Sequence, residues 1–384
     1  MMILLRVTIA FLLLLLLPDW YIHRVYLKGL ANWQKRLYWA PSLLLLALLG
    51  IFVTAQETFH DYFGIYLIVV LCIAVPKTFF VLFSLLVRGI GKLCRCSLPH
   101  GWIALFPSLG VCGYVIYGAV YGKENFKIHE VTYCSPDLPE AFDGYRILQI
   151  SDIHSGSWKG NSEGLQRAIN LCNAIQPDLA VFTGDLVNSR SDELPEFAPV
   201  FRQLTAKDGV YSILGNHDYG TYAHWDSEQD RLANVDSLIA YQRRMGWQLL
   251  LNEHRVLHRG NDSIALVGVE NCGKPPFPDR ADLPKALQGT EGMFKVLLSH
   301  DPTHWRREVL PDTDVQLMLA GHTHDMQISL LGFSVSRFIY PEHRGMYLEN
   351  GRGLYVNIGL GYVLFPMRLG AWPEITVLTL RKCN

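Results

Sequence analysis

The pattern of apolar and polar positions divides the chain into two parts. Apolar side chains form four long runs in the first 125 or so residues. Each run reaches, or nearly reaches, the ~20 residues that a helix needs to cross a bilayer. The runs are Met2–Tyr21, Trp39–Ala55, Gly64–Val87 and Trp102–Tyr121. We therefore expect residues 1–125 to form an all-α transmembrane region of about four helices.

From residue 126 to residue 384 the apolar runs are much shorter. Five of them hold four to six residues of mostly β-branched or large apolar type, too short for helices, and they predict buried strands. These runs are Arg146–Ile150, Leu179–Thr183, Val210–Leu214, Phe294–Leu298 and Val315–Ala320. Apolar positions at helical spacing from Leu165 to Ile175 predict a helix between the first two strands, which favours parallel pairing. If all five strands lie side by side in one sheet, the residues that follow them emerge at the same edge.

Directly after each run comes a cluster of acidic, imidazole or amide side chains. The clusters are Asp152-Ile153-His154, Gly184-Asp185, Gly215-Asn216-His217-Asp218, Ser299-His300-Asp301 and Gly321-His322-Thr323-His324. Each aspartate taken alone is equally well explained as a helix N-cap or a turn residue. Together, carboxylates, imidazoles and an amide carbonyl at one edge are the composition of a two-metal hydrolytic centre. Because these clusters contain nitrogen and oxygen ligands but no cysteine, they do not resemble a structural zinc site. They suit a catalytic manganese, iron or zinc ion.

The content and order of these clusters resemble the calcineurin-like metallophosphoesterase superfamily, whose pattern is D-x-H, G-D, G-N-H-[DE], a lone His and G-H-x-H. The resemblance covers roughly Val131 to the C-terminus. Phe142-Asp143-Gly144-Tyr145 and Pro373-Glu374-Ile375-Thr376 are also similar to a membrane-linked bacterial branch. The resemblance implies an α/β catalytic domain over residues 126–384, a layered β-sandwich flanked by helices. Asp325 departs from this branch, which often has Gly there, and we expect it to add a carboxylate beside the metals.

The resemblance implies two divalent metal ions. The side chains that would bind the first ion are Asp152, His154 and His324, and those that would bind the second are Asn216, His300 and His322. Asp185 would bridge the two ions, and a hydroxide between them would be the nucleophile. The chemistry supports this independently, because two ions about 3.5–4 Å apart neutralise a phosphate ester and supply hydroxide at neutral pH. Imidazole binds metals only when neutral, so we expect metal loading to weaken below about pH 6.

Other side chains would act on the substrate. By the same resemblance, His217 would protonate the leaving oxygen or stabilise the charge of the phosphate, and Asp218 would orient His217. Asn216 would also contact the phosphate. Arg368 is a further candidate, because a guanidinium can donate two hydrogen bonds to a phosphate; a plain surface or ion-pair role is its alternative.

Basic residues predict the orientation of the membrane part. Lys and Arg occur in the connections after the first and third apolar runs, whereas Gln56–Phe63 between the second and third runs has none. The positive-inside rule places the first and third connections in the cytoplasm. We therefore expect a multi-pass protein of the cell (inner) membrane with an extracytoplasmic catalytic domain. The first run is not followed by a small-residue cleavage site, which disfavours a secretory signal.

Lys77 and the cysteines leave alternatives open. Lys77 lies near the middle of the third run, beside Pro76, where a charge costs a few kcal/mol on insertion scales. It is either part of a functional site or located at a kink between two shorter segments that lets it reach water. Cys94 and Cys96 form a lone C-x-C, a weak metal signal. An oxidising compartment would permit a disulfide among the later cysteines, but the sequence does not assign one.

These observations define the expected function. A chain of 384 residues with a formal net charge of −1 carries no electrostatic footprint for nucleic acid, and we expect no nucleic-acid partner. We expect a membrane-anchored, metal-dependent phosphoesterase acting on a phosphomonoester or phosphodiester. The partners are then the lipid bilayer and a phosphoester substrate, and the tether favours a lipid-linked or envelope substrate. The alternatives are a nucleotide-sugar-lipid pyrophosphatase of lipid A synthesis and a non-catalytic membrane sensor. Sequence leaves the substrate and the oligomeric state open.

Overall fold

The computed structural model describes residues 2–54, 56–275 and 277–383. It divides the chain into two compact units. One unit comprises Met1–Tyr121 together with Leu364–Met367, and we call it the helical unit. The other comprises Gly122–Val363 and Arg368–Asn384, and we call it the sheet unit.

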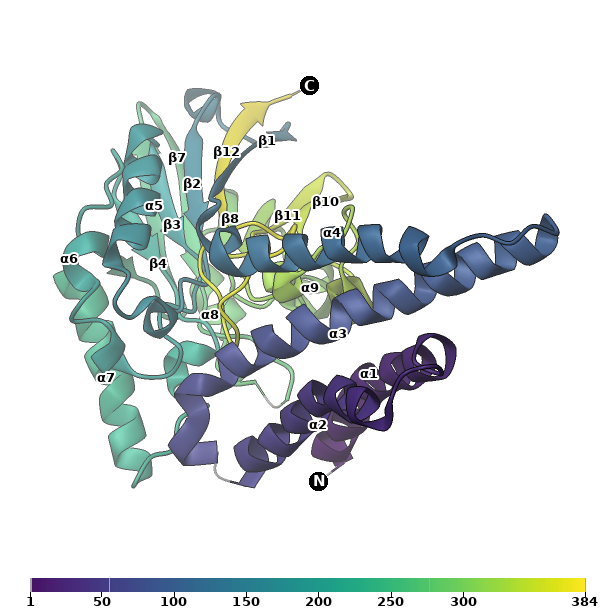
Figure 1. Cartoon of the computed structure of the whole chain (residues 1–384). Coiled ribbons are helices and arrows are strands. Elements are labelled where there is room, and N and C mark those ends of the chain that lie inside the picture. The colour runs from purple at the N-terminus through teal and green to yellow at the C-terminus, as the bar shows by residue number, and fades with distance from the viewer. Residues whose placement is uncertain (1, 55, 276, 384) are drawn as a thin grey trace. The chain divides into compact units, whose positions relative to one another are not determined.

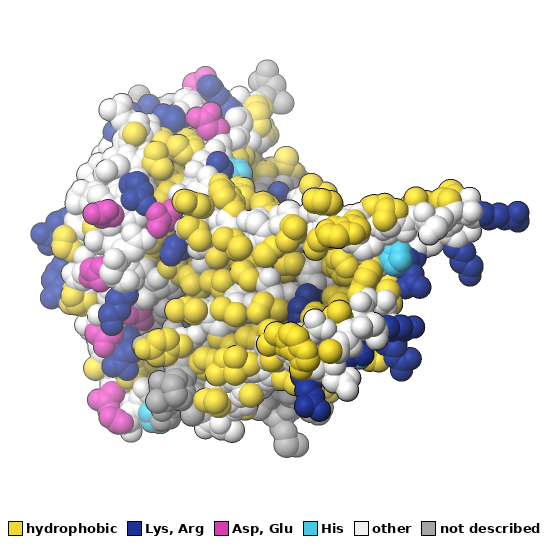
Figure 2. Space-filling model, in the orientation of Figure 1, with side chains coloured by type: hydrophobic (Ala, Val, Ile, Leu, Met, Phe, Trp, Pro, Cys, Tyr) yellow, Lys and Arg dark blue, Asp and Glu magenta, His cyan; other side chains and the backbone are white. Residues whose placement is uncertain are grey.

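The helical unit contains four long helices (Figure 1). They are α1 (Met2–Tyr26), α2 (Asn32–Thr54), α3 (Gln56–Leu93) and α4 (His100–Val120). Each contains a stretch long and apolar enough to cross a membrane, which confirms the four predicted segments. In Figure 2, Lys and Arg side chains gather at the end of this unit where α1 is followed by α2 and α3 by α4. The two basic connections therefore share one end of the bundle.

The proline in α3 does not break the helix, so the alternative of two shorter segments is wrong. Pro76 has no N–H for the carbonyl of Cys72, and the Sγ atom of Cys112 on α4 lies 3.9 Å from that oxygen. Spanning helices tolerate proline when a neighbouring helix supplies such a partner.

Lys77 is instead compensated by a polar cluster inside the helical unit. Its Nζ atom lies 2.7 Å from Oδ1 of Asp19 on α1 and 3.1 Å from Oγ of Ser42 on α2. The hydroxyl of Tyr38 donates to the same oxygen of Asp19 at 2.7 Å. Asp19 and Ser42 are fully buried. We call these four residues the Lys77 cluster; it links α1, α2 and α3.

The sheet unit consists of two six-stranded sheets, with strand orders β1-β12-β2-β3-β4-β5 and β10-β11-β9-β8-β7-β6. The strands are β1 (Lys127–Ser135), β2 (Arg146–Ile150), β3 (Leu179–Phe182), β4 (Val210–Ser212), β5 (Gln248–Leu249), β6 (Glu253–Arg259), β7 (Asp262–Gly268), β8 (Phe294–Leu298), β9 (Leu317–Ala320), β10 (Gly345–Glu349), β11 (Arg352–Val356) and β12 (Glu374–Lys382). The five predicted strands are present, but their placement in a single sheet is wrong. β2, β3 and β4 are parallel neighbours in the first sheet, and β8 and β9 are parallel neighbours in the second.

Burial on both faces explains why the strands are almost continuously apolar. Ile147 of β2 and Val296 of β8 share one buried cluster, so the two sheets pack face to face. The alternate residue Leu148 packs outward with Leu165 on the helix between β2 and β3, which confirms that expected helix. The helices of this unit are α5 (Ser162–Ala174), α6 (Ala198–Phe201), α7 (Glu228–Arg244), α8 (Leu283–Leu287) and α9 (Leu310–Asp312). Figure 1 shows α5, α6 and α7 beside β2–β4. The layered β-sandwich flanked by helices is confirmed.

A disulfide joins the ends of two neighbouring strands of the sheet unit. β1 and β12 pair in parallel with Cys134 opposite Arg381, which brings Cys383 close to Cys134. The two cysteines form a disulfide with a Cα–Cα distance of 5.6 Å. Among the residues that the structure describes, Cys94 and Cys96 are free and exposed.

Candidate metal centre

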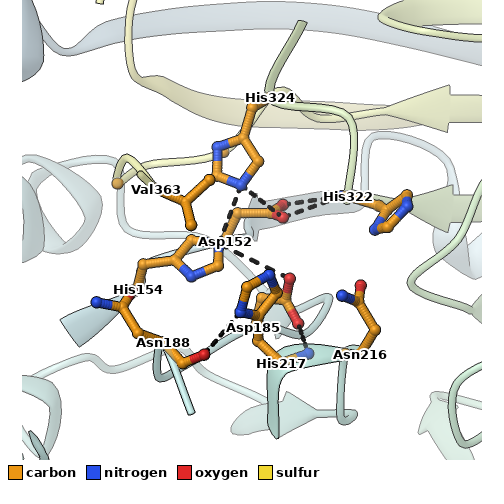
Figure 3. A network of polar contacts seen from close by, with 12 residues as sticks. Asp152, His154, Asp185, Asn188, Asn216, His217, His322, His324 and Val363 are labelled. Atoms are coloured by element: carbon orange, nitrogen blue, oxygen red, sulfur yellow. Dashed lines mark hydrogen bonds and ion pairs between the residues drawn. The ribbon is translucent and has the colours of Figure 1, made fainter. Parts of the chain in front are cut away.

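Side chains that follow strands of both sheets meet at one end of the sandwich (Figure 3). Asp152 and His154 follow β2, and His324 follows β9. The Nε2 atoms of His154 and His324 lie 3.0 Å apart, and Oδ1 of Asp152 lies 3.3 Å from Nε2 of His324. All three residues are buried, and their ligand atoms lie within 4.8 Å of one another. The three predicted ligands of the first ion therefore form one compact group.

A second group lies around His300, which follows β8. Its Nε2 atom lies 3.2 Å from Oδ2 of Asp185 and 3.1 Å from Oδ1 of Asn216. Ligand atoms of Asp185, His300 and His322 lie within 4.8 Å of one another. Asp185 also groups within that distance with His154. The carboxylate predicted to bridge two ions thus lies beside one member of the first group, His154, at 3.7 Å, and belongs to the second group.

The donor atoms fit divalent cations. Two ligands that each lie about 2.1 Å from one ion are separated by roughly 3 Å, the spacing seen between His154 and His324. Nδ1 of His300 lies 2.7 Å from the carbonyl oxygen of Thr183 and donates there, so Nε2, which faces Asp185, is the atom that would bind an ion. The amide N–H of His322 donates to both oxygens of Asp152, at 3.1 and 3.0 Å, and holds that carboxylate in place.

The electrostatics of the cluster also suit metal binding. Burial lowers the pKa of His154, His322 and His324, which keeps these imidazoles neutral. Burial also disfavours the charged form of His300, but the carboxylate of Asp185 outweighs it and raises the pKa of His300 to about 10. Burial alone would raise the pKa of Asp185, but His300 and other imidazoles hold it well below its usual value.

The backbone is strained at the predicted ligands. Five non-glycine residues among them lie in the left-handed region, with φ of 51° for Asp152, 52° for His154, 63° for Asp185, 76° for His322 and 49° for His324. Such conformations cost about 1–3 kcal/mol each and persist where the surrounding structure imposes them, often at functional sites. The strain is an indication of function that does not depend on side-chain chemistry.

His217 lies at the edge of the cluster. Its backbone N–H donates to Oδ1 of Asp185 at 2.9 Å, and its Nδ1 atom lies 2.6 Å from the carbonyl oxygen of Asn188 (Figure 3). Its ring stacks on Tyr222, with the centroids 4.2 Å apart. Nδ1 therefore donates to Asn188, and Nε2 is left to meet a substrate.

The contacts of Asp218 differ from the expected ones. Its carboxylate accepts backbone N–H groups from the turns after β3 and β4, at 2.9–3.2 Å; the donors are Asp185, Leu186, Val187 and Gly215. The contact that orients His217 comes from Asn188 instead. Burial, with the charge of Asp185, raises the pKa of Asp218 to about 7. Asp218 thus joins the two turns that carry Asp185 and Asn216.

Two further expectations are corrected. Arg368 is fully buried rather than on the surface, and its guanidinium donates to the carbonyl oxygens of Gly361 and Gly359. Its Nη2 atom lies 3.0 Å from Nδ1 of His324, so it positions a predicted ligand. The carboxylate of Asp325 lies 3.1 Å from Nη1 of Arg344, and in the described part of the chain it belongs to none of the metal-ligand groups.

Sequence reasoning missed the aromatic border of the site. The hydroxyl of Tyr340 lies 2.9 Å from Nε2 of His322, and Phe277 meets the same ring edge-on at 5.0 Å. The Nδ2 group of Asn216 donates to the hydroxyl of Tyr222 at 2.8 Å. These aromatic residues belong to loops without a recurrent spacing, and no pattern in the sequence marks them.

Comparison with known proteins gives matches in both units. The family model "Calcineurin-like phosphoesterase" matches residues 145–326, and "Probable Calcineurin-like phosphoesterase, transmembrane domain" matches residues 4–123. A "Transmembrane protein with metallophosphoesterase domain" from Danio rerio is 32% identical over 278 residues, which are 70% of this chain and 60% of that protein. The uncharacterized metallophosphoesterase YkuE of Bacillus subtilis is 33% identical over 287 residues, 71% of this chain and 93% of YkuE. The UDP-2,3-diacylglucosamine pyrophosphatase LpxG of Chlamydia trachomatis is 30% identical over 285 residues, 60% of this chain and 83% of LpxG.

Proposed function

Since this chain belongs to the calcineurin-like phosphoesterase family, we propose that it is a membrane-anchored hydrolase of phosphomonoesters or phosphodiesters with two divalent metal ions. The observation that carries the proposal is the convergence of the predicted ligands. Ligand atoms of Asp185 lie within 4.8 Å of His154, which also groups with Asp152 and His324, and within 4.8 Å of His300 and His322. When bound, the two ions would neutralise the charge of the phosphate and supply hydroxide at neutral pH.

The protein's own residues have separate tasks in this proposal. Asp185 holds the two ligand groups together, and Asn216 offers its carbonyl oxygen without adding charge. His217, held through Nδ1 by Asn188, gives a proton from Nε2 to the leaving oxygen. The carbonyl of Asn188 accepts from Nδ1 and fixes the orientation of the ring. Asp218 and Arg368 position the ligands without touching the substrate.

His217→Gln in the purified full-length protein tests this assignment. We expect the variant to keep its metal content and to lose roughly 10²–10⁴-fold in kcat, as for other general acids. The loss should be larger for an alkyl phosphate than for an aryl phosphate, whose leaving group needs less protonation. His258→Gln, at an exposed histidine of β6, is the control. Equal losses on both esters would reject proton donation and favour stabilisation of the phosphate charge.

We further propose that the sheet unit lies outside the cytoplasm. The basic connections support this by the positive-inside rule. The disulfide between Cys134 and Cys383 supports it independently, because disulfides persist in oxidising compartments. In intact cells, a membrane-impermeant maleimide should leave Cys94 and Cys96 unlabelled, and a reporter fused after Asn384 should be active only outside. Labelling of both cysteines before lysis would reverse the orientation.

A second candidate function is hydrolysis of the pyrophosphate bond of a nucleotide-sugar lipid. The similarity to LpxG favours it, since that relative is named for this activity. Such a substrate is made in the cytoplasm and requires the opposite orientation. The reporter fusion therefore separates the two candidates, and an assay of the purified chain with UDP-2,3-diacylglucosamine tests the second one directly.

A further inference from the structure

Residues 326–339, which we call the apolar loop, expose large hydrophobic side chains directly after the last predicted ligand. Leu331 is fully exposed and Phe338 is 76% exposed. The other exposed members are Met326, Leu330, Phe333, Val335 and Ile339. Water-soluble surfaces rarely gather so many apolar side chains, and such patches mark interaction sites.

The tip of the apolar loop is unfavourable for its own sequence. Leu330 and Phe333 exchange backbone hydrogen bonds of 2.8 and 2.9 Å, which closes a tight turn. Its central residues, Leu331 and Gly332, have φ of 51° and 82°. Turns with two positive φ values favour Asn-Gly, because leucine gains nothing locally in the left-handed conformation. The backbone and the solvent both disfavour Leu331 at this position, which suggests that its side chain is used.

The charge of the loop fits a lipid surface. Residues 326–341 contain Arg337 and no carboxylate. The guanidinium of Arg337 lies 5.5 Å from the centroid of the Phe333 ring, and the rings of Phe333 and Phe338 are 5.8 Å apart. Leucine and phenylalanine with a basic residue and no acid are typical of segments that enter the bilayer interface and meet anionic headgroups.

Both ends of the apolar loop are fixed at the candidate metal centre. The loop follows His324 after one residue, and Oγ of Ser334 donates to the carbonyl oxygen of Asp325 at 2.7 Å. At its other end comes Tyr340, whose hydroxyl lies 2.9 Å from Nε2 of His322. A molecule held by the loop is therefore brought to the imidazoles.

A short connection limits how far the sheet unit can move from the membrane. The chain has four candidate membrane spans, and residues 121–126 alone connect α4 to β1. A connection of this length reaches at most roughly 20 Å. The sheet unit therefore stays near the membrane surface. For this reason we take lipid, rather than a second protein, as the partner of the apolar loop.

We propose that the apolar loop inserts into the bilayer interface and admits to the metal centre the phosphate of a lipid whose acyl chains remain in the membrane. This inference rests on the proposed hydrolysis and assigns its substrate class. It also gives the aromatic border a task, since Tyr340 and Phe277 would separate the headgroup from the acyl region.

The kinetic test uses the full-length chain in phosphatidylcholine vesicles. The variant Leu331→Asn/Phe338→Asn is compared with Leu348→Asn, which alters an exposed leucine of β10 outside the loop. The loop variant should hydrolyse p-nitrophenyl phosphate within twofold of wild type and lose at least tenfold on phosphatidic acid in the vesicles. The control should keep both rates. Equal retention of both rates by the loop variant would overturn the proposal.

A second measurement needs no activity. Leu331→Cys and Leu348→Cys, each made with Cys94→Ser and Cys96→Ser, carry a nitroxide spin label in the same vesicles. Oxygen concentrates in the bilayer and the nickel complex used for comparison stays in water. The label at position 331 should therefore be relaxed more by oxygen, and the label at position 348 more by nickel. A label at position 331 that favours nickel refutes membrane insertion. If the wild-type protein hydrolyses aryl phosphate but not phosphatidic acid, the lipid substrate is refuted and the proposed function stands. If the wild-type protein hydrolyses neither ester while the label at position 331 is relaxed by oxygen, the proposed function is refuted and membrane insertion stands.

Discussion

Both units bury charged side chains, but they compensate the charge in opposite ways. In the Lys77 cluster one cation meets one anion at 2.7 Å, Tyr38 donates to the same carboxylate oxygen, and Lys77 also donates to Ser42. In the sheet unit, the ion-pair partners of Asp152 and Asp185 within the described ranges are imidazoles. Two of these imidazoles, His154 and His324, are kept neutral by burial, which lowers their pKa.

The difference separates a structural cluster from a binding cluster. An ion pair such as Lys77 and Asp19 cancels its own charge, so it needs no ion from solution and serves to link the helices. A cluster of carboxylates and neutral imidazoles has lone pairs without enough positive charge to match them, and it therefore binds cations. The strained backbone of the candidate metal centre holds these side chains at the spacing that an ion requires. Burial of charge is common to both, so it identifies neither.

Removing the shared carboxylate should have the largest effect. Asp185→Asn leaves one oxygen ligand but lowers the charge between the two groups, and we expect a loss of at least roughly 10²–10³-fold in kcat together with lower metal content. Asp178→Asn is the matched control, because Asp178 is buried in the same unit and pairs with Lys207. Elemental analysis and aryl phosphate turnover measure both quantities. Full metal content with normal turnover in Asp185→Asn would reject the binuclear centre.

Breaking the Lys77 cluster should affect stability and leave the chemistry intact. Lys77→Met leaves Asp19 as an uncompensated buried carboxylate, which costs about 3–5 kcal/mol in buried pairs. The double variant Lys77→Met/Asp19→Asn should recover much of that loss, because no charge is left without a partner. Thermal unfolding in detergent measures the free energies, with Lys92→Met at the exposed end of α3 as control. If the folded Lys77→Met protein lost aryl phosphate turnover, the cluster would have a role beyond packing.

What the sequence predicts are features set by neighbours along the chain. A short apolar run fixes a strand, and the polar residues directly after it emerge at the strand end, so Asp152 and His300 could be named in advance. Four long apolar runs likewise predict four spanning helices. The division of the strands between two sheets was missed, because strands buried on both faces have the same apolar pattern in either arrangement.

What the sequence does not predict depends on tertiary packing. Asp19 and Lys77 lie on different helices, and no spacing relates them. The same is true of Asn188, whose backbone carbonyl rather than its side chain meets His217. The surface role for Arg368 rested on the ordinary exposure of charged residues, whereas its guanidinium is buried and donates to backbone carbonyls. Asp325 was expected beside the metals from its position after His324, but its carboxylate pairs with Arg344.

The smallest effect should be a pH dependence of metal affinity that the Lys77 cluster cannot show. Because Asp185 raises the pKa of His300 to about 10, the metal-free protein carries an imidazolium there at neutral pH. An ion must displace this proton, so affinity should increase with pH, about tenfold per unit, until His300 is neutral near pH 10. Between pH 8 and 9 Asp218 no longer contributes, since its pKa is about 7.

Calorimetric titration of the metal-free chain with Mn²⁺ measures this dependence. Buffers of different ionisation enthalpy should report about one proton released per protein at pH 8–9. At acid pH, His154, His322 and His324 should stay neutral to lower pH than free imidazole, because burial lowers their pKa. Protonation of these three side chains should therefore weaken metal binding only below the expected limit near pH 6. An affinity that stays constant from pH 8 to 9, with no proton released, would mean that His300 binds as a neutral ligand from the start and that Asp185 does not hold a proton on it.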